Sequence, residues 1–589
     1  MSLLEVGDLT ISYTDSAEPA VSELSFALER GESLGVVGES GSGKTQMAMA
    51  IMGLLPANAE IRGSIVFDDT ELIGAGPDLL NRFRARRIAM VFQDPMAALN
   101  PYVRIGKQLK RILMEHELCK TGEATERTLD MLRKVGLPDP ERQYRAFPHQ
   151  LSGGMRQRAM IGAALLGEPD LLVADEPTTA LDVTVQAQIL HLLKELRAES
   201  DAALLLITHD LGVVAGNCER MLVMDRGQLL EEGTTQEVFG SPASEKMRAL
   251  LAAAPRVSGE SQASQAPASS KAVLDIEELS VSFKEQRDRG RVNAVRPIDL
   301  TLNKGETVAV VGESGSGKTS LARAVVGLIP ADTGRSMFLG NFLPGSLNTR
   351  NQESRRELQM VFQDPLASLN PAMRVSDIVA EPLRVHEPGD ETHEASVEAI
   401  LCQVGLGSEL LERYPHELSG GQAQRVAIAR SLILKPTVMI CDEAVAALDG
   451  TVQDEILQLL RAEQQRSGLS LIFITHDLAV VRQISHRVLV MYMGRLCELA
   501  NNESLFGRPR HPYTKALLNA VPLPDPNARP VDAPLAGEVS SVLKPPSGCP
   551  FHPRCQQAIA ICSESVPEPA DCDGSFVACH RAAELDLSY

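Results

Sequence analysis

The chain has 589 residues, which corresponds to about two to four domains at roughly 150 residues each. Hydrophobic residues make up 44% of the sequence and charged residues 23%, which is typical of a soluble globular protein and excludes a wholly disordered or fibrous chain. The formal net charge of -20 is unfavourable for coating nucleic acid or anionic lipid, although a local basic patch is compatible with it.

No stretch of the sequence reaches the roughly 18 apolar residues that would span a bilayer. The first ten residues, MSLLEVGDLT, contain two acidic residues and no basic one, so they do not form a secretory signal. The sequence therefore predicts a cytosolic protein, whose ten cysteines are thiols or metal ligands rather than disulfides.

Three short apolar segments in the first half predict buried parallel strands: ESLGVVG at 32–38, LLVAD at 171–175 and LLLIT at 204–208. Each leads into polar or glycine-rich residues. In an open parallel sheet, ligands bind beyond the carboxyl ends of the strands, so these residues are candidates for one site. Residues 105–148 have helical patterns between these strands, which predicts a helical insertion into an α/β domain.

The segment GESGSGKT at 38–45 fits the P-loop pattern G-x-x-x-x-G-K-[ST] and follows the first strand. Its glycines let backbone N–H groups converge on phosphate oxygens, and the next helix adds its positive end. Lys44 is expected at the β- and γ-phosphates, and Thr45 is expected to offer its hydroxyl to Mg²⁺. The predicted nucleotide-binding residues here are Gly38, Ser40, Gly41, Gly43, Lys44 and Thr45.

A pair of carboxylates closes the second strand. Asp175 is placed to hold Mg²⁺ directly or through water. Glu176 follows immediately and is expected to polarise the water that attacks the γ-phosphate.

The second half repeats these motifs in the same order. The matching pairs are GESGSGKT at 38–45 and 312–319, VFQDP at 91–95 and 361–365, LSGG at 151–154 and 418–421, DE at 175–176 and 442–443, and THD at 208–210 and 475–477. Five collinear matches indicate a tandem duplication. The second copy therefore predicts a nucleotide site at Gly312, Ser314, Gly315, Gly317, Lys318 and Thr319, a magnesium ligand at Asp442, and a catalytic base at Glu443.

The predicted boundaries follow from this duplication and from composition. Residues 1–255 form the first domain and 273–505 the second, and a Ser-, Ala- and Gln-rich segment at 256–272 is a flexible linker. Residues 506–589 form a tail rich in proline and cysteine that the first copy lacks.

The segments LSGGMRQR at 151–158 and LSGGQAQR at 418–425 resemble the signature motif of ATP-binding cassette (ABC) ATPases. Together with the P-loops and the DE pairs, they cover every motif of that family twice. The resemblance implies an α/β fold of two tandem P-loop cassettes, each with a helical insertion subdomain. It also implies that two ATP molecules bind between a head-to-tail pair, with each P-loop facing the other copy's signature.

The resemblance also implies roles for further residues. The signatures would close over the γ-phosphate through Ser152, Gly153, Gly154, Ser419, Gly420 and Gly421. Gln93 and Gln363 would serve catalysis and Mg²⁺, His209 and His476 would contact the γ-phosphate, and Tyr13 and Phe283 would stack on adenine, with core packing as the alternative for either ring. The D-loop residues that cross the interface would be Asp182 and Asp449.

Both halves keep these groups, so two hydrolytic sites are expected. The second copy departs from the pattern at one place, where EPTTALD at 176–182 becomes EAVAALD at 443–449. This change removes no known catalytic group of the family, but unequal sites are compatible with it.

The tail contains RPRHPYTKALLNAVP at 508–522 and GCPFHPRC at 548–555, and it resembles the C-terminal region of the oligopeptide, dipeptide and nickel importer ATPases. The cysteines that match this subfamily are Cys549, Cys555, Cys562 and Cys579, which could hold a [4Fe–4S] cluster. Zinc and unmetallated thiols are the alternatives, and Cys572 has no assigned role.

The resemblance therefore implies an ATP- and Mg²⁺-dependent motor of a peptide importer at the cytoplasmic face of a bacterial inner membrane. Its expected partners are two integral-membrane permease subunits and an extracytoplasmic solute-binding protein, with no nucleic acid. The same subfamily also transports glutathione, nickel chelates, opines and sugars. A soluble twin-cassette ATPase acting on ribosomes or DNA, and an exporter ATPase, are the alternatives. The short, nearly neutral linker disfavours the former and the tail disfavours the latter.

Overall fold

The computed structural model describes residues 2–14, 18–39, 41–179, 181–254, 271–284, 291–387, 393–445, 448, 450–528, 535, 537, 543 and 545–587. Ser40, Asp449 and nearly all of the predicted linker lie outside the described residues. The chain forms two compact units. The first holds most of residues 1–254, and the second holds most of 255–589, including the cysteine-rich segment. Within the described parts of the chain, no helix combines the length and apolar character needed to cross a membrane.

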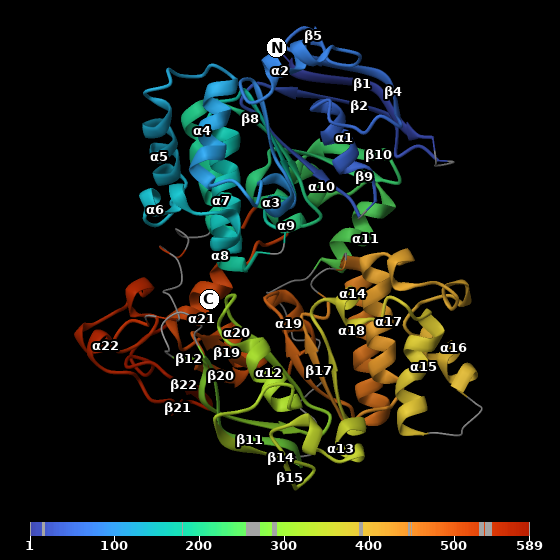
Figure 1. Ribbon diagram of the computed structural model, residues 1–589, viewed down its shortest axis with the longest axis vertical. Coiled ribbons are helices and arrows are strands. Elements are labelled where there is room, and N and C mark those ends of the chain that lie inside the picture. The colour runs from blue at the N-terminus through green and yellow to red at the C-terminus, as the bar shows by residue number, and fades with distance from the viewer. Residues whose placement is uncertain are drawn as a thin grey trace. The chain divides into compact units, whose positions relative to one another are not determined.

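The first unit contains two sheets (Figure 1). An antiparallel sheet has the order β2-β1-β4-β5 and consists of β1 (Ser2–Tyr13), β2 (Val21–Glu29), β4 (Ala59–Phe67) and β5 (Thr70–Glu71). A mainly parallel sheet has the order β10-β9-β3-β8-β7-β6 and consists of β3 (Ser33–Val37), β6 (Ile88–Val91), β7 (Leu171–Asp175), β8 (Ala203–Ile207), β9 (Arg220–Asp225) and β10 (Gln228–Thr234). The three strands predicted from apolar runs are β3, β7 and β8. They are parallel neighbours, and every residue in them is buried.

The helices of the first unit are α1 (Lys44–Ile51), α2 (Pro77–Phe83), α3 (Pro95–Ala98), α4 (Ile105–Glu115), α5 (Ala124–Lys134), α6 (Pro140–Arg145), the short 3₁₀ helix η1 (Pro148–Gln150), α7 (Gly153–Leu165), α8 (Val183–Ser200), α9 (Leu211–Asn217), α10 (Thr235–Gly240) and α11 (Glu245–Ala253). The predicted helical insertion is confirmed. It comprises α4, α5 and α6, which pack on one another, and α4 and α5 also pack on α7 (Figure 1). Leu109 and Leu113 of α4 and Leu132 of α5 lie in its core, so the apolar stripes of these two helices stabilise the insertion.

The second unit repeats this architecture. Its antiparallel sheet has the order β12-β11-β14-β15 and consists of β11 (Ala272–Lys284), β12 (Arg291–Asn303), β14 (Thr333–Phe338) and β15 (Asn341–Leu343). The other sheet has the order β16-β17-β18-β13-β19-β20-β22-β21 and consists of β13 (Thr307–Val311), β16 (Leu358–Val361), β17 (Val438–Asp442), β18 (Ser470–Ile474), β19 (Arg487–Tyr492), β20 (Arg495–Asn501), β21 (Ala570–Cys572) and β22 (Ser575–Val577). The first six of these strands match the order found in the first unit, which confirms that the two cassettes share one fold.

The helices of the second unit are α12 (Lys318–Val326), η2 (Leu347–Thr349), α13 (Gln352–Glu357), α14 (Pro365–Ser368), α15 (Val375–His386), α16 (His393–Gln403), η3 (Ser408–Leu410), η4 (Pro415–Glu417), α17 (Gly420–Leu432), α18 (Gly450–Ser467), α19 (Leu478–Ile484), α20 (Asn502–Gly507), α21 (Pro512–Asn519), η5 (His552–Arg554) and α22 (Ala560–Glu564). The last strands of the tail, β21 and β22, extend the cassette's sheet, because β22 pairs antiparallel with β20. The tail is therefore joined to the second cassette through backbone hydrogen bonds.

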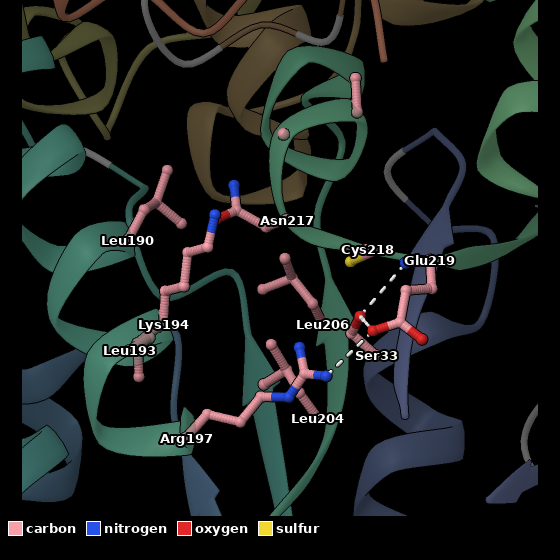
Figure 2. A pocket seen from close by; sticks show the side chains of 12 residues that line it. Ser33, Leu190, Leu193, Lys194, Arg197, Leu204, Leu206, Asn217, Cys218 and Glu219 are labelled. Atoms are coloured by element: carbon pink, nitrogen blue, oxygen red, sulfur yellow. Dashed lines mark hydrogen bonds and ion pairs between the residues drawn. The ribbon is translucent and has the colours of Figure 1, made fainter. Parts of the chain in front are cut away.

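A cavity of about 250 Å³ lies in the first unit between α8 and the sheet (Figure 2). Leu190 and Leu193 contribute apolar walls, and the side chains of Lys194 and Arg197 extend beside them. Ser33, another lining residue, is the first residue of β3, whereas the P-loop follows the last residue of that strand. The cavity is therefore at the end of the strands away from the P-loop and does not belong to the nucleotide site.

Candidate functional site

The first P-loop connects β3 to α1 through backbone that favours glycine. Gly41 has φ 83° and Gly43 has φ 95°, both in the left-handed region. A Cβ atom at Gly43 would lie 2.4 Å from the Ala20 carbonyl oxygen, so a larger residue would displace the loop. Lys44 is 5% exposed, and its Nζ donates hydrogen bonds to the carbonyls of Gly38 and Glu39, both at 2.8 Å. The loop thus wraps around its own lysine.

The second P-loop has the same form between β13 and α12. Gly317 has φ 100°, and a Cβ there would lie 2.3 Å from the Ala294 carbonyl oxygen. Lys318 Nζ donates to the carbonyls of Gly312 at 2.6 Å and Glu313 at 3.0 Å. Burial lowers the pKa of Lys318 below its ordinary value. The two loops therefore hold their lysines in equivalent positions.

Each P-loop threonine is hydrogen-bonded to the aspartate that ends β7 or β17, the second strand from the one that leads into its P-loop. Thr45 Oγ1 donates to Asp175 Oδ1 at 3.2 Å, and Thr319 Oγ1 donates to Asp442 Oδ1 at 3.0 Å. Burial raises the pKa of Asp175 to about 6, and it also raises the pKa of Asp442. Asp442 Oδ2 is buried and has no hydrogen-bond partner among the described residues. A buried oxygen of this kind next to a hydroxyl fits a hard cation such as Mg²⁺.

Glu176 is the centre of a hydrogen-bonded cluster in the first unit. Gln93 Nε2 donates to its Oε2 at 2.8 Å, Thr179 Oγ1 donates to the same oxygen at 2.8 Å, and His209 Nδ1 lies 3.2 Å from its Oε1. Burial opposes ionisation of Glu176, but the hydrogen bond and charge of His209 outweigh it and lower the pKa of Glu176 to about 2. The hydrogen bond to Glu176 in turn raises the pKa of His209.

Glu443 occupies the equivalent position in the second unit. Gln363 Nε2 donates to Glu443 Oε2 at 2.7 Å, whereas His476 Nδ1 lies 3.8 Å from Glu443 Oε1. The interaction with His476 lowers the pKa of Glu443, although burial opposes this. Burial alone would lower the pKa of His476, but Glu443 raises it. Both sites therefore pair a glutamate with a histidine and a glutamine.

The two glutamates also share an unusual backbone. Glu176 has φ 46° and Glu443 has φ 50°, in the left-handed region that non-glycine residues seldom adopt. Such backbone costs about 1–3 kcal/mol and persists where the surrounding structure enforces it. Here, hydrogen bonds from Glu176 N to the Ile207 carbonyl and from Glu443 N to the Ile474 carbonyl anchor each residue to the next strand.

Thr179 is a site residue that sequence reasoning missed. Its hydroxyl contacts Glu176, and the sequence has Ala446 at the corresponding place in the second copy. The change from EPTT to EAVA therefore removes the threonine whose hydroxyl contacts the glutamate in the first copy. Because the contact depends on how the loop folds back, the motif alone did not reveal it.

The signature serines each begin a helix. Ser152 Oγ accepts a hydrogen bond from Met155 N at 3.2 Å at the start of α7, and Ser419 Oγ accepts one from Gln422 N at 3.2 Å at the start of α17. Both serines are exposed, as expected for residues that must contact a ligand or another surface. Gly153, Gly154, Gly420 and Gly421 form the first turns of these helices. Asp182 lies immediately before α8.

The two rings that were candidates for adenine stacking are the last or next-to-last residues of their strands. Tyr13 ends β1, is partly buried and contacts Gln46 through its hydroxyl. Phe283 lies near the end of β11 and is 45% exposed. Tyr13 packs against the hydrophobic core of the first unit, whereas Phe283 is largely outside the core. The stacking role stays a prediction for both rings.

The four cysteines of the predicted cluster lie in the tail of the second unit. Cys549 N donates to the Cys562 carbonyl at 2.8 Å. Burial raises the pKa of Cys579 to about 11, and the thiols of Cys549, Cys555 and Cys562 add to this increase. In the described part of the chain, however, no group of three or more His, Cys, Asp or Glu side chains is placed to hold a metal ion. The placement of Cys549, Cys555, Cys562 and Cys579 therefore gives no support for a [4Fe–4S] cluster.

The fold and the paired sites define a duplicated P-loop ATPase, and comparisons with protein families and related sequences agree. The ABC transporter family model matches residues 21–179 and 295–446, and the model "Oligopeptide/dipeptide transporter, C-terminal region" matches residues 497–562. The glutathione import ATP-binding protein GsiA of Pectobacterium atrosepticum is 40% identical over 90% of this chain and 90% of its own length. The peptidoglycan transport ATP-binding protein YejF of Agrobacterium fabrum is 44% identical over 88% of this chain and 96% of its own. Among solved structures, a dimeric ATP-binding cassette bound to ADP and phosphate is 25% identical, with a TM-score of 0.36, and covers 39% of this chain and 98% of that one.

The chain belongs to the ATP-binding proteins of ABC transporters. It carries two cassettes and the C-terminal region of the oligopeptide and dipeptide transporters, and it is an ABC-type transport ATPase.

Proposed function

We propose that this protein is the ATP-hydrolysing motor of an importer for peptides or peptide-like solutes. The observation that carries the proposal is the presence, in one chain, of two clusters built around Glu176 and Glu443, together with a tail of the oligopeptide and dipeptide transporter type. ATP hydrolysis at two sites would drive transport, and the type of the tail supports import as the direction of transport.

The residues have the following proposed roles at each site. The P-loop N–H groups and the lysine, Lys44 or Lys318, bind the phosphates of the substrate ATP. Thr45 with Asp175, and Thr319 with Asp442, would hold Mg²⁺, with Gln93 and Gln363 completing the ligand set. The bound ion would neutralise charge on the phosphates.

Glu176 and Glu443 are the proposed bases that accept a proton from the attacking water. Because their pKa values are lowered, both are ionised near neutral pH and able to accept it. His209 and His476 orient these carboxylates and offer a hydrogen bond toward the γ-phosphate. The hydrogen bonds from Gln93 and Gln363 hold the carboxylates in place.

We propose that the remaining ligands of each ATP come from the signature of the other cassette. Ser152, Gly153 and Gly154 would then serve the nucleotide on Lys318, and Ser419, Gly420 and Gly421 the nucleotide on Lys44, with the D-loop residues Asp182 and Asp449 alongside. The signature sequences and the exposure of both serines support this arrangement. Nucleotide binding would join the cassettes, and hydrolysis would release them.

The names of the relatives guide the choice of solute and partners. They describe glutathione import and peptidoglycan transport, and both solutes contain peptide bonds or short peptides. The proposed partners are two integral-membrane permease subunits and an extracytoplasmic solute-binding protein. The chain would act as a peripheral protein at the cytoplasmic face of the inner membrane.

A pull-down tests this function directly. The tagged chain, recovered from detergent-solubilised membranes of its source organism, is expected to bring two membrane proteins with it. The complex of the tagged chain with these membrane proteins is then reconstituted. Its ATPase activity should rise several-fold when a solute-binding protein loaded with peptide or glutathione is added. Recovery of ribosomal proteins without membrane proteins would contradict the importer and favour a soluble twin-cassette ATPase.

We also propose, from the cysteine pattern of the sequence, that the tail cysteines hold a [4Fe–4S] cluster. The match of Cys549, Cys555, Cys562 and Cys579 to the subfamily supports this. Anaerobic purification should then give a brown protein with about four iron and four sulfide ions per chain. Replacement of Cys555 by Ser should remove the colour, and replacement of Cys402, an exposed cysteine outside the tail, should not. A colourless preparation free of iron would contradict the cluster.

A further inference from the structure

A buried ion pair joins the tail to the second P-loop. Arg554, the last residue of η5, donates from Nη1 to Glu313 Oε2 at 2.7 Å and from Nη2 to Glu313 Oε1 at 3.0 Å. The arginine side chain is 5% exposed and the glutamate side chain 2% exposed. Two parallel hydrogen bonds of this kind fix both the position and the orientation of the carboxylate.

Glu313 is the second residue of the P-loop GESGSGKT, and its backbone is fixed as well. Its N–H donates to Tyr513 Oη at 2.9 Å, and its carbonyl accepts from Lys318 Nζ at 3.0 Å. Tyr513 belongs to α21, another element of the tail. Arg554 and Tyr513 thus contact the same loop residue whose carbonyl touches the phosphate-binding lysine.

A cluster of three aromatic rings lies next to the contacts that Arg554 and Tyr513 make with Glu313. The rings of Tyr492 and Tyr513 lie 4.7 Å apart, and Phe551 packs against both, at 5.5 Å and 5.2 Å between centroids. Phe551 stands three residues before Arg554, and all three rings are buried. These rings therefore pack the start of η5 against α21 and β19 in the interior of the second unit.

The first cassette holds the corresponding glutamate in a different way. Glu39 pairs with Lys246 of α11 at 2.6 Å, and these side chains are 28% and 21% exposed. A partly exposed lysine is a weaker and less directional partner than a buried bidentate arginine. The two P-loops therefore differ in the partner of their glutamate. Among the described residues, a buried arginine of the tail contacts the glutamate of the second P-loop, and a partly exposed lysine pairs with the glutamate of the first.

We propose that Arg554 is a positioning residue for the second ATP site, through which nucleotide binding at Lys318 depends on the fold of the C-terminal tail. The inference rests on the proposed role of Lys318 in binding ATP. Loss of the arginine leaves Glu313 as a buried carboxylate without its ion-pair partner, which favours rearrangement of the loop. The first ATP site should be much less sensitive to the tail.

Binding of the fluorescent nucleotide mant-ATP to the full chain tests this proposal. A Lys44→Ala background removes the first site, so one nucleotide per chain reports on the second. In this background, Arg554→Met is expected to weaken binding at least tenfold. The matched control Arg508→Met breaks a half-exposed ion pair with Asp586, also in the tail, and should change affinity less than twofold.

A second comparison separates positioning from general destabilisation. In a Glu313→Gln background, Arg554→Met should weaken binding less than twofold further, because the contact it removes is already lost. Should Arg554→Met fail to fold, Arg554→Lys keeps the charge, loses the bidentate geometry and should weaken binding about threefold or more. Unchanged affinity in a folded Arg554→Met or Arg554→Lys protein, or an equal loss in the Glu313→Gln background, would overturn the proposal. If the Lys44→Ala parent itself bound no nucleotide, the proposed role of Lys318 would fail instead.

Discussion

Replacement of both Glu176 and Glu443 by glutamine is expected to lower steady-state ATP hydrolysis at least a hundredfold while ATP stays bound. Glutamine keeps the size and shape of glutamate, so Gln93 and Gln363 can still contact it. It cannot accept a proton from water, and general-base catalysis of this type contributes roughly 10²–10⁴ in rate. Phosphate release at saturating MgATP measures the effect.

The single variants and a surface control complete this test. Each single change should remove the turnover of one site, and the loss should be larger at the first site if the Thr179 hydrogen bond makes it the more active one. Glu199→Gln, at an exposed position of α8, should leave hydrolysis unchanged. Hydrolysis by the double variant above one tenth of the wild-type rate would show that another group acts as the base.

Acid is expected to destabilise the second unit through His511. This histidine is 2% exposed and caps α21, with Nδ1 accepting a hydrogen bond from Tyr513 N at 3.0 Å. Burial lowers the pKa of His511 from 6.5 to about 4, so the folded state binds a proton less readily than the unfolded state. The contribution of neutral His511 to the free energy of unfolding is fully present above pH 6.5 and is lost as the pH falls toward 4. At pH 5, the loss in the free energy of unfolding is about 2 kcal/mol.

His511→Asn isolates this effect, because asparagine can cap the helix but does not titrate. The nearby Glu498 has its pKa raised by burial and so opposes the effect of His511 below neutral pH, but it is present in both proteins. Urea unfolding of the second unit, followed at pH 7.5 and pH 5, should show a loss that is about 2 kcal/mol smaller in the variant. His416→Asn, at an exposed position, is the matched control. An equal acid loss in wild type and His511→Asn would contradict the role of His511.

Much of each cassette could be predicted from the sequence because its signals are local. Strands β3, β7 and β8 are short and buried on both faces, so they appear as continuous apolar runs. The insertion of α4, α5 and α6 shows a helical apolar period. The P-loop and the DE pair have fixed spacing, which is why Lys44, Asp175 and Glu176 could be named before their contacts were known.

The remaining features depend on contacts between distant segments. β22 has three residues, and its pairing of Val577 with Glu498 gives no local pattern. The contact of Arg554 with Glu313 joins residues far apart in the chain, and nothing in GESGSGKT distinguishes Glu313 from Glu39. The tail cysteines show the reverse case, since their pattern suggests a metal cluster, whereas no group of three or more metal ligands lies together among the described residues.

Counting the nucleotides retained by the Glu176→Gln/Glu443→Gln chain tests the central claim most directly. After incubation with MgATP and rapid desalting, two ATP molecules per chain and almost no ADP are expected, because both sites bind and neither hydrolyses. One ATP per chain would show that only one cassette holds a working site, and bound ADP in place of ATP would show that Glu176 and Glu443 are not the catalytic bases.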